Sequence, residues 1–447
     1  MSIDLLKFYQ GCNPSKTLNF EKAQDRQYYI DFSSVRGGKI IEELRRTIVR
    51  LSPEDPTCQL FTGHIGCGKS TELLRLKAEL ESEGFHVVYF ESSQDLEMAD
   101  VDMSDILLAI ARQVSENLAA IGIELQSGYF HKQFQEISEF LHGIELSETQ
   151  ELSGAIAQIT DRAKGSPKLR TQLRQYLEPR TSRILQAINE EILLPATAQL
   201  KERGKQGLVA IVDNLDRVDN RPLSSGRSLP EYLFVDRGEQ LRKLKCHLVY
   251  TIPLSLIFSH ESEALKTRLG GGVAPKVLPM VPVKLRSGSP CEAGLNLLRQ
   301  MILARAFPHT DPDSRMQYID CIFDTSDSLD RLCNISGGHV RNLLGLIFRC
   351  LQREDPPFSR ETIELLIEER RNDLILALSP HDWELLRQVH ETKNISSEAT
   401  YQTLLRSMFV FEYRHADAGR WFDINPILIE AKAFKQGNFG SRSLSFG

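Results

Sequence analysis

The sequence lacks the features that mark several classes of protein. Its longest apolar stretches, such as residues 208–212, fall far short of the ~18 apolar residues that a membrane helix needs. Asp4 lies early and no basic-then-apolar order follows, so we expect no secretory signal. Gly and Pro number only 28 and 19, which excludes a collagen-like or low-complexity chain. No two of the eight cysteines have CxxC spacing, so we expect free thiols, no structural zinc and a cytoplasmic location. Because long apolar runs are lacking, we expect no membrane partner.

The charge balance is slightly acidic. Of the 447 residues, 54 are Lys or Arg and 60 are Asp or Glu, which gives a net charge of −6. This balance argues against a protein that coats nucleic acid by charge alone, although it is compatible with a local basic face. At roughly 100–200 residues per domain, the chain is expected to hold two or three domains.

Short β-rich runs alternate with helical patterns, which indicates an α/β fold with a parallel sheet. The runs are residues 59–62, 86–92, 208–213, 247–252 and 276–283. The gap between the second and third runs is far longer than one crossover helix needs. We therefore expect a helical insertion at about residues 101–206, with helix breaks at Pro179 and Pro195.

The pattern predicts five divisions of the chain. They are an N-terminal lead-in (residues 1–50), an α/β core that contains the insertion (51–285), a helical lid (286–378), a winged-helix-like domain (379–433) and a tail (434–447). The fourth division has the order helix, helix, hairpin, with strands expected at residues 409–413 and 421–424. The tail is rich in Gly and Ser, and it is expected to be disordered.

One segment matches a phosphate-binding pattern without a mismatch. The pattern G-x-x-x-x-G-K-[ST] is followed by Thr71; the segment reads Gly63, His64, Ile65, Gly66, Cys67, Gly68, Lys69, Ser70 and Thr71. An apolar run precedes it and a helical pattern follows, so backbone N–H groups and a helix N-terminus are expected to bind phosphate oxygens.

The same pattern assigns roles to individual side chains. Lys69 is predicted to contact the β- and γ-phosphates, Ser70 to bind Mg²⁺, and Thr71 to lie near the α-phosphate. Cys67 either fills space or is a thiol whose oxidation blocks the loop. The sequence therefore predicts ATP and Mg²⁺ as cofactors.

A carboxylate ends the buried-strand run 208–212. Asp213 is predicted to hold Mg²⁺ through water, with a strand-end cap as the alternative. The next residue, Asn214, cannot accept a proton, although it can position water. Hydrolysis is therefore expected to be slow and to rest on Asp216 or on another group. A surface or ion-pairing role for Asp216 is an equal alternative.

With these residues in view, the sequence resembles the AAA+ superfamily. It is most similar to origin-recognition-type ATPases and to STAND signalling ATPases, including KAP-like proteins that have a helical insertion. The resemblance rests on residues 63–71 and 209–217 and covers roughly residues 25–430. It implies a P-loop NTPase sheet, a helical lid, a C-terminal winged helix and ATP hydrolase activity.

The resemblance also implies further site residues. Thr251 corresponds to a sensor of the γ-phosphate or its water, and Arg341, at the end of the turn 336–341, corresponds to a second sensor. Arg268 corresponds to an arginine finger aimed at a neighbouring subunit, and Arg237 is its rival. A buried strand threonine and solvated arginines are the alternatives. Residues 28–32 and 35–37 resemble a segment that covers adenine, although core packing explains them equally well.

The winged-helix-like end leaves two interpretations. Residues 381–432 hold more acids than bases, whereas a DNA reader needs a basic face. Within residues 397–420, such a face could be formed by Arg406, Arg414, His415 and Arg420. Docking on the ATPase core is favoured over DNA binding.

Two functions remain. The first is a nucleotide-driven switch or assembly ATPase with protein partners and self-association, for example in bacterial defence or signalling. The alternative is a DNA-binding ATPase that loads or regulates a replication or transposition machine. A small-molecule kinase, which also uses a phosphate loop, is disfavoured by the sensor-like turn 336–341 and by the winged-helix-like end.

Overall fold

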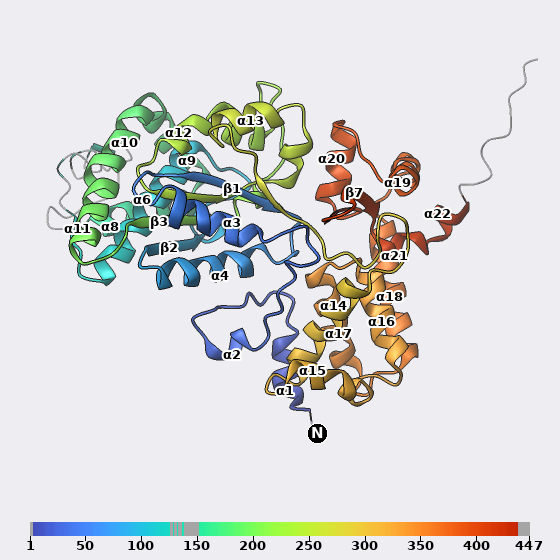
Figure 1. Ribbon diagram of the computed structural model, residues 1–447. Coiled ribbons are helices and arrows are strands. Elements are labelled where there is room, and N and C mark those ends of the chain that lie inside the picture. The colour runs from blue at the N-terminus through green and yellow to red at the C-terminus, as the bar shows by residue number, and fades with distance from the viewer. Residues whose placement is uncertain (1–2, 126–127, 129–131, 133–135, 138–151, 437–447) are drawn as a thin grey trace, which may run out of the picture. The chain divides into compact units, whose positions relative to one another are not determined.

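A computed structural model describes residues 3–125, 128, 132, 136–137 and 152–436. The chain folds into two compact units, each assembled from separate segments (Figure 1). The sheet unit comprises residues 41–62 and 72–277. The lid unit comprises residues 1–40, 63–71 and 278–447. Residues 63–71 are thus grouped with the C-terminal part of the chain.

The sheet unit is built on the predicted parallel sheet. The strands are β1 (Cys58–Gly63), β2 (His86–Glu91), β3 (Leu208–Asp213), β4 (His247–Thr251) and β5 (Lys276–Leu278). They lie in the order β2-β3-β4-β1-β5. Because β1, β3 and β4 pair in parallel, their carboxyl ends share one edge of the sheet. The α/β P-loop NTPase fold expected from the sequence is confirmed.

The last strand is shorter than expected. Residues 276–283 form a β-rich run, but β5 ends at Leu278. Pro279 follows and has no N–H group to continue the ladder. In the lid unit, Met280 N–H instead donates to the carbonyl of Glu412 at 3.0 Å.

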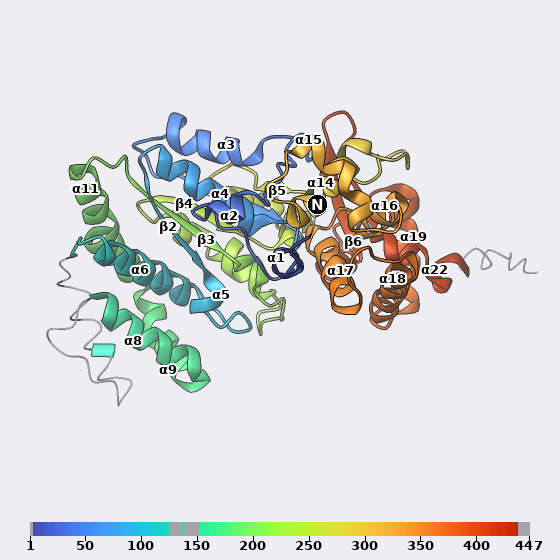
Figure 2. The ribbon, with the colours of Figure 1, turned by 90° about the horizontal axis from the view of Figure 1, so that it is seen from below.

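Helices cover both faces of the sheet. Figure 2 shows α3 and α4 on one side of the strands and α6 on the other. The helices of this part of the chain are α3 (Ile40–Arg46), α4 (Lys69–Ser82), α5 (Ser92–Asp95), α6 (Met103–Ala120), α8 (Leu152–Gly165), α9 (Pro167–Leu177), α10 (Thr181–Ala187), α11 (Leu194–Glu202), α12 (Gly238–Arg242) and α13 (Ser262–Arg268), with short 3₁₀ or π segments at Thr47–Leu51, Glu178–Arg180, Ile188–Leu193, Leu215–Arg217, Glu231–Asp236 and Leu254–Phe258.

The insertion is helical over its described residues, as predicted. Its apolar side chains, such as Ile106, Ile110 and Val114 of α6, are buried in the same core as the sheet residues. Pro179 does interrupt the helical run, within the 3₁₀ turn Glu178–Arg180. At Pro195 the helical run continues without a break, although it changes there from the π segment Ile188–Leu193 to the α-helix α11. Most of residues 126–151 fall outside the described part of the chain.

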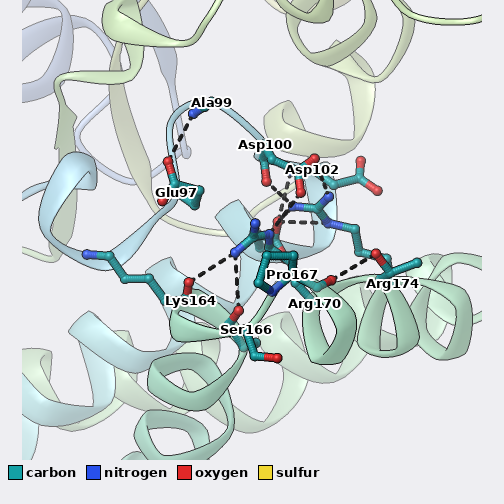
Figure 3. Close-up of polar contacts among 12 residues, drawn as sticks. Glu97, Ala99, Asp100, Asp102, Lys164, Ser166, Pro167, Arg170 and Arg174 are labelled. Carbon is teal, nitrogen blue, oxygen red and sulfur yellow. Dashed lines mark hydrogen bonds and ion pairs between the residues drawn. The ribbon is translucent and has the colours of Figure 1, made fainter.

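A cluster of charges joins the insertion to the loop after α5. Asp100 accepts hydrogen bonds from Arg170 Nε at 2.9 Å and from Arg174 Nη1 at 2.8 Å, both on α9 (Figure 3). Arg221, which follows β3, reaches the same carboxylate at 2.8 Å. Arg170 is buried, so loss of Asp100 would leave its charge without its main counter-ion. Asp100 thus ties the insertion to the segments that leave β2 and β3.

The lid unit consists of helices and one hairpin. Its elements are α1 (Leu5–Gly11), α2 (Ala23–Arg26), α14 (Glu292–Ala306), α15 (Pro312–Arg315), a 3₁₀ segment (Met316–Cys321), α16 (Ser326–Ser336), α17 (Val340–Arg353), α18 (Arg360–Ile375), α19 (Pro380–Thr392), α20 (Ala399–Arg406), β6 (Val410–His415), β7 (Gly419–Ile424), α21 (Pro426–Ile429) and α22 (Lys432–Gln436). The predicted order helix, helix, hairpin is present in α19, α20, β6 and β7.

Two features complete this unit. The lead-in is fixed to α14 by the buried Arg305, whose Nε donates to the carbonyl of Gly11 at 3.0 Å. The tail was expected to begin at residue 434, but α22 extends to Gln436 and the remaining residues lie outside the described ranges. All eight cysteines fall within the described part of the chain, and none forms a disulfide. Among the described residues, no helix has the length and apolar composition to cross a bilayer.

Candidate functional site

The phosphate loop, residues 63–71, runs from the end of β1 into the first turn of α4. Lys69 is the first residue of that helix and its side chain is buried. Its Nζ donates to the carbonyls of Gly63 at 2.8 Å and His64 at 2.9 Å. The ammonium group is therefore held inside the loop, above the N-terminus of a 14-residue helix. A helix N-terminus with an adjacent ammonium favours an anion.

The next three loop carbonyls accept hydrogen bonds from other segments of the lid unit. Ile65 accepts from the His339 ring at 2.8 Å, and Gly66 accepts from the Arg341 N–H at 3.2 Å. Arg36 Nη2 donates to the carbonyl of Cys67 at 2.9 Å. The loop conformation is thus fixed by the lead-in and by the start of α17.

The His339 ring has a defined tautomer. Its Nδ1 accepts a hydrogen bond from the Asn342 N–H at 2.9 Å, so Nε2 carries the proton that is donated to Ile65. Gly66 lies against this ring with φ of +84°, and a Cβ at that position would come within 2.7 Å of His339 Cε1. Only glycine permits such a close approach in this left-handed conformation.

The loop also contacts the C-terminal hairpin. The backbone N–H of Glu412, on β6, donates to His64 Nε2 at 2.9 Å, and both residues are buried. Burial, together with the neighbouring His339 and Lys69, lowers the pKa of His64 to about 3. Burial likewise lowers the pKa of His339 to about 4. Both rings are therefore neutral at pH 7, as their accepting nitrogens require.

One acidic and two basic residues of the hairpin pair with one another. Glu412 is fully buried, and one carboxylate oxygen accepts from Arg414 Nε and Arg420 Nε, each at 3.0 Å. The Tyr413 hydroxyl donates to the carbonyl of Gly337 at 2.8 Å, next to the turn that leads to His339. Two of the four residues considered for a DNA-binding face thus serve this internal pair, which agrees with a docked hairpin.

The carboxyl edge of the sheet holds the second group of candidate residues. Asp213 is buried at the end of β3, where one carboxylate oxygen accepts from the Tyr89 hydroxyl at 2.9 Å and the other from the Asn214 N–H at 2.7 Å. Asn214 has φ of +65° and ψ of 5°, and its amide reaches Ser93 Oγ at 3.3 Å. The carboxylate is thus oriented by neighbouring groups of the sheet unit.

Thr251 lies at the same edge, at the end of β4. It is completely buried, and its hydroxyl accepts from the Leu215 N–H at 3.0 Å and faces the carbonyl of Val212 at 3.4 Å. These contacts connect β4 to the turn that follows Asp213. They agree with a structural threonine, and its sensor role stays a prediction.

The remaining predicted residues of the sheet unit have different settings. Asp216 is half-buried in the turn Leu215–Arg217. Arg268 ends α13, where Nη1 lies 3.6 Å from Asp236 and its side chain is 46% exposed. Its rival, Arg237, is half-buried and packs over the ring of Tyr232 at 5.7 Å. Arg268 is therefore the more accessible of the two to a second subunit.

Arg341 lies where the loop meets a cavity of the lid unit. The cavity measures about 450 Å³ and is lined by α16, α17, α18, α21 and Pro14 of the lead-in. Arg341 contributes its side chain to the wall and its backbone N–H to the loop. Its predicted role at the γ-phosphate stays a prediction. Cys67 is completely buried, with Sγ 3.6 Å from the carbonyl of Leu278, which agrees with the space-filling interpretation.

Sequence reasoning missed three contacts of the loop. Arg36 was considered for covering adenine, but its guanidinium binds the carbonyl of Cys67. The sequence indicates His339 only as part of a turn, and no pattern in it predicts the hairpin at His64. No local spacing signals these contacts, because each joins segments distant in the sequence. Tyr28 and Phe32 are buried, which agrees with the core-packing alternative for residues 28–32.

The two histidines make the loop contacts sensitive to acid. Each has a folded-state pKa below its unfolded value of ~6.5, so their stabilising effect is present at neutral pH and is lost as the pH falls from about 6.5 towards 4. At pH 5 the loss approaches ~2 kcal/mol for each ring. Urea unfolding at pH 7 and pH 5 measures this loss. We expect His64→Gln to flatten the pH dependence, and an equally steep dependence in that variant would contradict the assignment.

Comparisons with known proteins agree with the motif. The model of the KAP family P-loop domain matches residues 38–226, which include the phosphate loop and Asp213. The resemblance to KAP-like P-loop proteins, which rested on residues 63–71 and 209–217, is thereby confirmed for this part of the chain. A search of the curated proteins finds no match to the sequence.

Several solved structures are similar over most of the chain. The Walker-type ATPase PABY2304 of Pyrococcus abyssi is 13% identical, with a TM-score of 0.42 and coverage of 90% of this chain and 98% of that one. Cdc6p from Pyrobaculum aerophilum is 10% identical, with a TM-score of 0.39 and coverage of 92% and 97%. The Aeropyrum pernix ORC2 protein, in ADPNP–ADP complexes, is 14% identical, with a TM-score of 0.42 and coverage of 88% and 91%.

Proposed function

We propose, from the KAP-type P-loop domain that residues 38–226 provide, that this protein is an ATPase that acts as a nucleotide-driven switch. ATP would bind at the phosphate loop, where the N-terminus of α4 and the ammonium of Lys69 would contact its phosphates. At Gly68 the loop is open, since an added Cβ there would have no atom within 4 Å. These features suit a triphosphate.

Oxygen ligands suit the accompanying metal. Ser70 would offer a hydroxyl to Mg²⁺ and Asp213 a carboxylate through water, and hard cations prefer such oxygen atoms. Bound Mg²⁺ would neutralise charge on the phosphates. Thr251, Arg341 and Arg268 would serve as the two sensors and the arginine finger, and Asn214 would position water. Tyr89 would keep the Asp213 carboxylate oriented.

One observation carries the switch: the phosphate loop is bonded to the C-terminal hairpin and to the start of α17 within one compact unit. A ligand that changes the loop must strengthen or weaken these bonds. Ligand binding then shifts the equilibrium between the bonded and unbonded hairpin by some factor. By linkage, a shift of the hairpin between these states changes the affinity for the ligand by that same factor. Nucleotide binding at the loop would thus change the conformation or the dynamics of the hairpin.

A switch of this kind acts through partners. We infer that it contacts proteins and self-associates in the cytoplasm, with Arg268 available to a second copy. Bacterial defence or signalling would be one setting. Duplex DNA is the alternative partner, through residues 397–420, as in a machine that loads or regulates replication or transposition. The internal pairing of Arg414 and Arg420 with Glu412 favours a protein partner.

Mass photometry tests the proposal directly. The full chain is measured with and without Mg²⁺-ATP, each with and without duplex DNA. We expect ATP to change the distribution of masses while DNA adds none. Arg341→Ala should bind ATP normally and lose the ATP-dependent change. Masses that change only with DNA would favour the alternative function, and masses unaffected by ATP would contradict the switch.

A further inference from the structure

We propose that the cavity of the lid unit is a binding site for a small aromatic anion, separate from the phosphate loop. The cavity measures about 450 Å³ and is lined by residues of the lid unit alone, chiefly from α17 and α18. None of its lining residues belongs to the loop 63–71, all of which the structure describes. Sites for small organic ligands commonly measure ~300–1,000 Å³, so this volume suits one.

Gly345 keeps the cavity open. It lies in the interior of α17, where glycine is less favourable than any residue except proline. The packing around it does not require glycine, because an added Cβ would have Pro14 Cβ, at 3.9 Å, as its nearest neighbour outside the backbone of its own helix. A helix that loses stability here without a packing reason points to a functional use of the space.

The walls of the cavity suit aromatic rings. Leu346 and Phe348 of α17 and Ile427 of α21 contribute apolar surface. Phe348 is held in place by stacking on Tyr9, with the ring centroids 4.2 Å apart. An engineered cavity of roughly 150 Å³ takes up benzene, so a cavity of about 450 Å³ has room for two or three rings.

The charges around the cavity favour an anion. The charged lining residues are Arg341, Arg349, Arg370 and Asp373. Arg349 pairs with Glu369, so that three arginines face two carboxylates when Glu369 is included. Arg370 is exposed and forms no ion pair with any residue that the structure describes. Its guanidinium can therefore bind the acid group of a ligand through two parallel hydrogen bonds.

Arg341 connects the cavity with the phosphate loop. It lines the cavity, and its backbone N–H donates to the carbonyl of Gly66 at 3.2 Å. A ligand that displaces the start of α17 changes the loop, and by linkage a nucleotide at the loop then changes the affinity of the cavity for its ligand. This coupling rests on the proposed function, whereas binding at the cavity does not.

Two fluorescent probes with the same rings test the site in the full-length protein. Anilinonaphthalene sulfonate carries a sulfonate in place of the acid group, and phenylnaphthylamine lacks it. Gly345→Leu fills the cavity, and Arg370→Gln removes one of its guanidinium groups. Arg360→Gln is the matched control, because Arg360 lies on α18 outside the cavity lining.

The two variants should affect the probes differently. We expect Gly345→Leu to weaken the binding of both probes by at least about tenfold. Arg370→Gln should weaken only the sulfonate, by about tenfold, because a charge-assisted hydrogen bond contributes that much. Arg360→Gln should bind both probes as wild type does.

Other results would overturn the inference. Gly345→Leu that binds both probes as tightly as wild type excludes the cavity as their site, as does wild type that binds neither with a dissociation constant below about 1 mM. Equal effects of Arg370→Gln on the two probes exclude the preference for an anion. If Gly345→Leu does not fold, the ratio of the two affinities in Arg370→Gln decides.

Competition with Mg²⁺-ATP separates the cavity from the nucleotide site. We expect ATP to change the affinity for the sulfonate by a factor of about two or more that becomes constant once ATP saturates, and to change nothing in Lys69→Ala. An affinity that keeps falling in proportion to ATP would assign the cavity to the nucleotide and overturn the inference, and an unchanged affinity would exclude the coupling. Wild type that binds no ATP overturns the proposed function, while Gly345→Leu and Arg370→Gln still decide the cavity.

Discussion

Lys69→Ala is expected to reduce the affinity for ATP by at least about 100-fold. The ammonium of Lys69 lies at the start of α4, where it donates to the carbonyls of Gly63 and His64. Bound phosphates would replace these by charge-assisted hydrogen bonds, each contributing roughly 1.5–3 kcal/mol. The loss of two such bonds corresponds to 100-fold or more. Isothermal titration calorimetry with Mg²⁺-ATP measures the change.

Lys77→Ala is the matched control. Lys77 lies on the same helix, two turns further along, and pairs with Glu81 at 3.1 Å. We expect its affinity for ATP to equal that of wild type. If Lys69→Ala bound ATP as tightly as Lys77→Ala does, residues 63–71 would not be the nucleotide site.

Gly66→Ala is expected to break the contact between the loop and α17. Its new Cβ would lie 2.7 Å from His339 Cε1 and 2.9 Å from Arg341 Cβ, closer than carbon atoms pack. The left-handed φ of +84° adds strain of roughly 1–2 kcal/mol, and the overlap adds a further ~1–3 kcal/mol. We therefore expect the free energy of unfolding to fall by about 2–5 kcal/mol, measured by urea denaturation without nucleotide.

Gly68→Ala separates strain from overlap. Gly68 also has a positive φ, of +107°, but an added Cβ would have no atom within 4 Å. Its unfolding free energy should fall only by the backbone strain, roughly 1–2 kcal/mol. Equal destabilisation in the two variants would show that the loop does not pack against His339 and Arg341 as described.

The sequence allowed much of the sheet to be predicted, because the signals there are local. The phosphate-loop pattern occupies nine consecutive residues, and the all-buried strand Leu208–Asp213 is a continuous apolar run that ends in an acid. Local rules also had limits. Pro279 ends β5 early, whereas Pro195 falls in a first helical turn and breaks nothing.

The contacts of the phosphate loop could not be predicted from the sequence in the same way. Glu412 bonds to His64 from 348 positions away, and it does so through its backbone N–H, which every residue except proline carries. His339 reaches Ile65 across 274 positions. Tertiary packing decides such pairs, and a single sequence contains no spacing that encodes them.

Hydrogen–deuterium exchange with and without Mg²⁺-ATP tests the central claim most directly, namely that nucleotide at the phosphate loop is reported by the C-terminal hairpin. Peptides that cover residues 63–71 and 410–424 are compared, with α9 of the insertion as the internal reference. We expect ATP to change exchange in both the loop and the hairpin, and Lys69→Ala to abolish both changes. Protection confined to residues 63–71, with the hairpin unaffected, would contradict it.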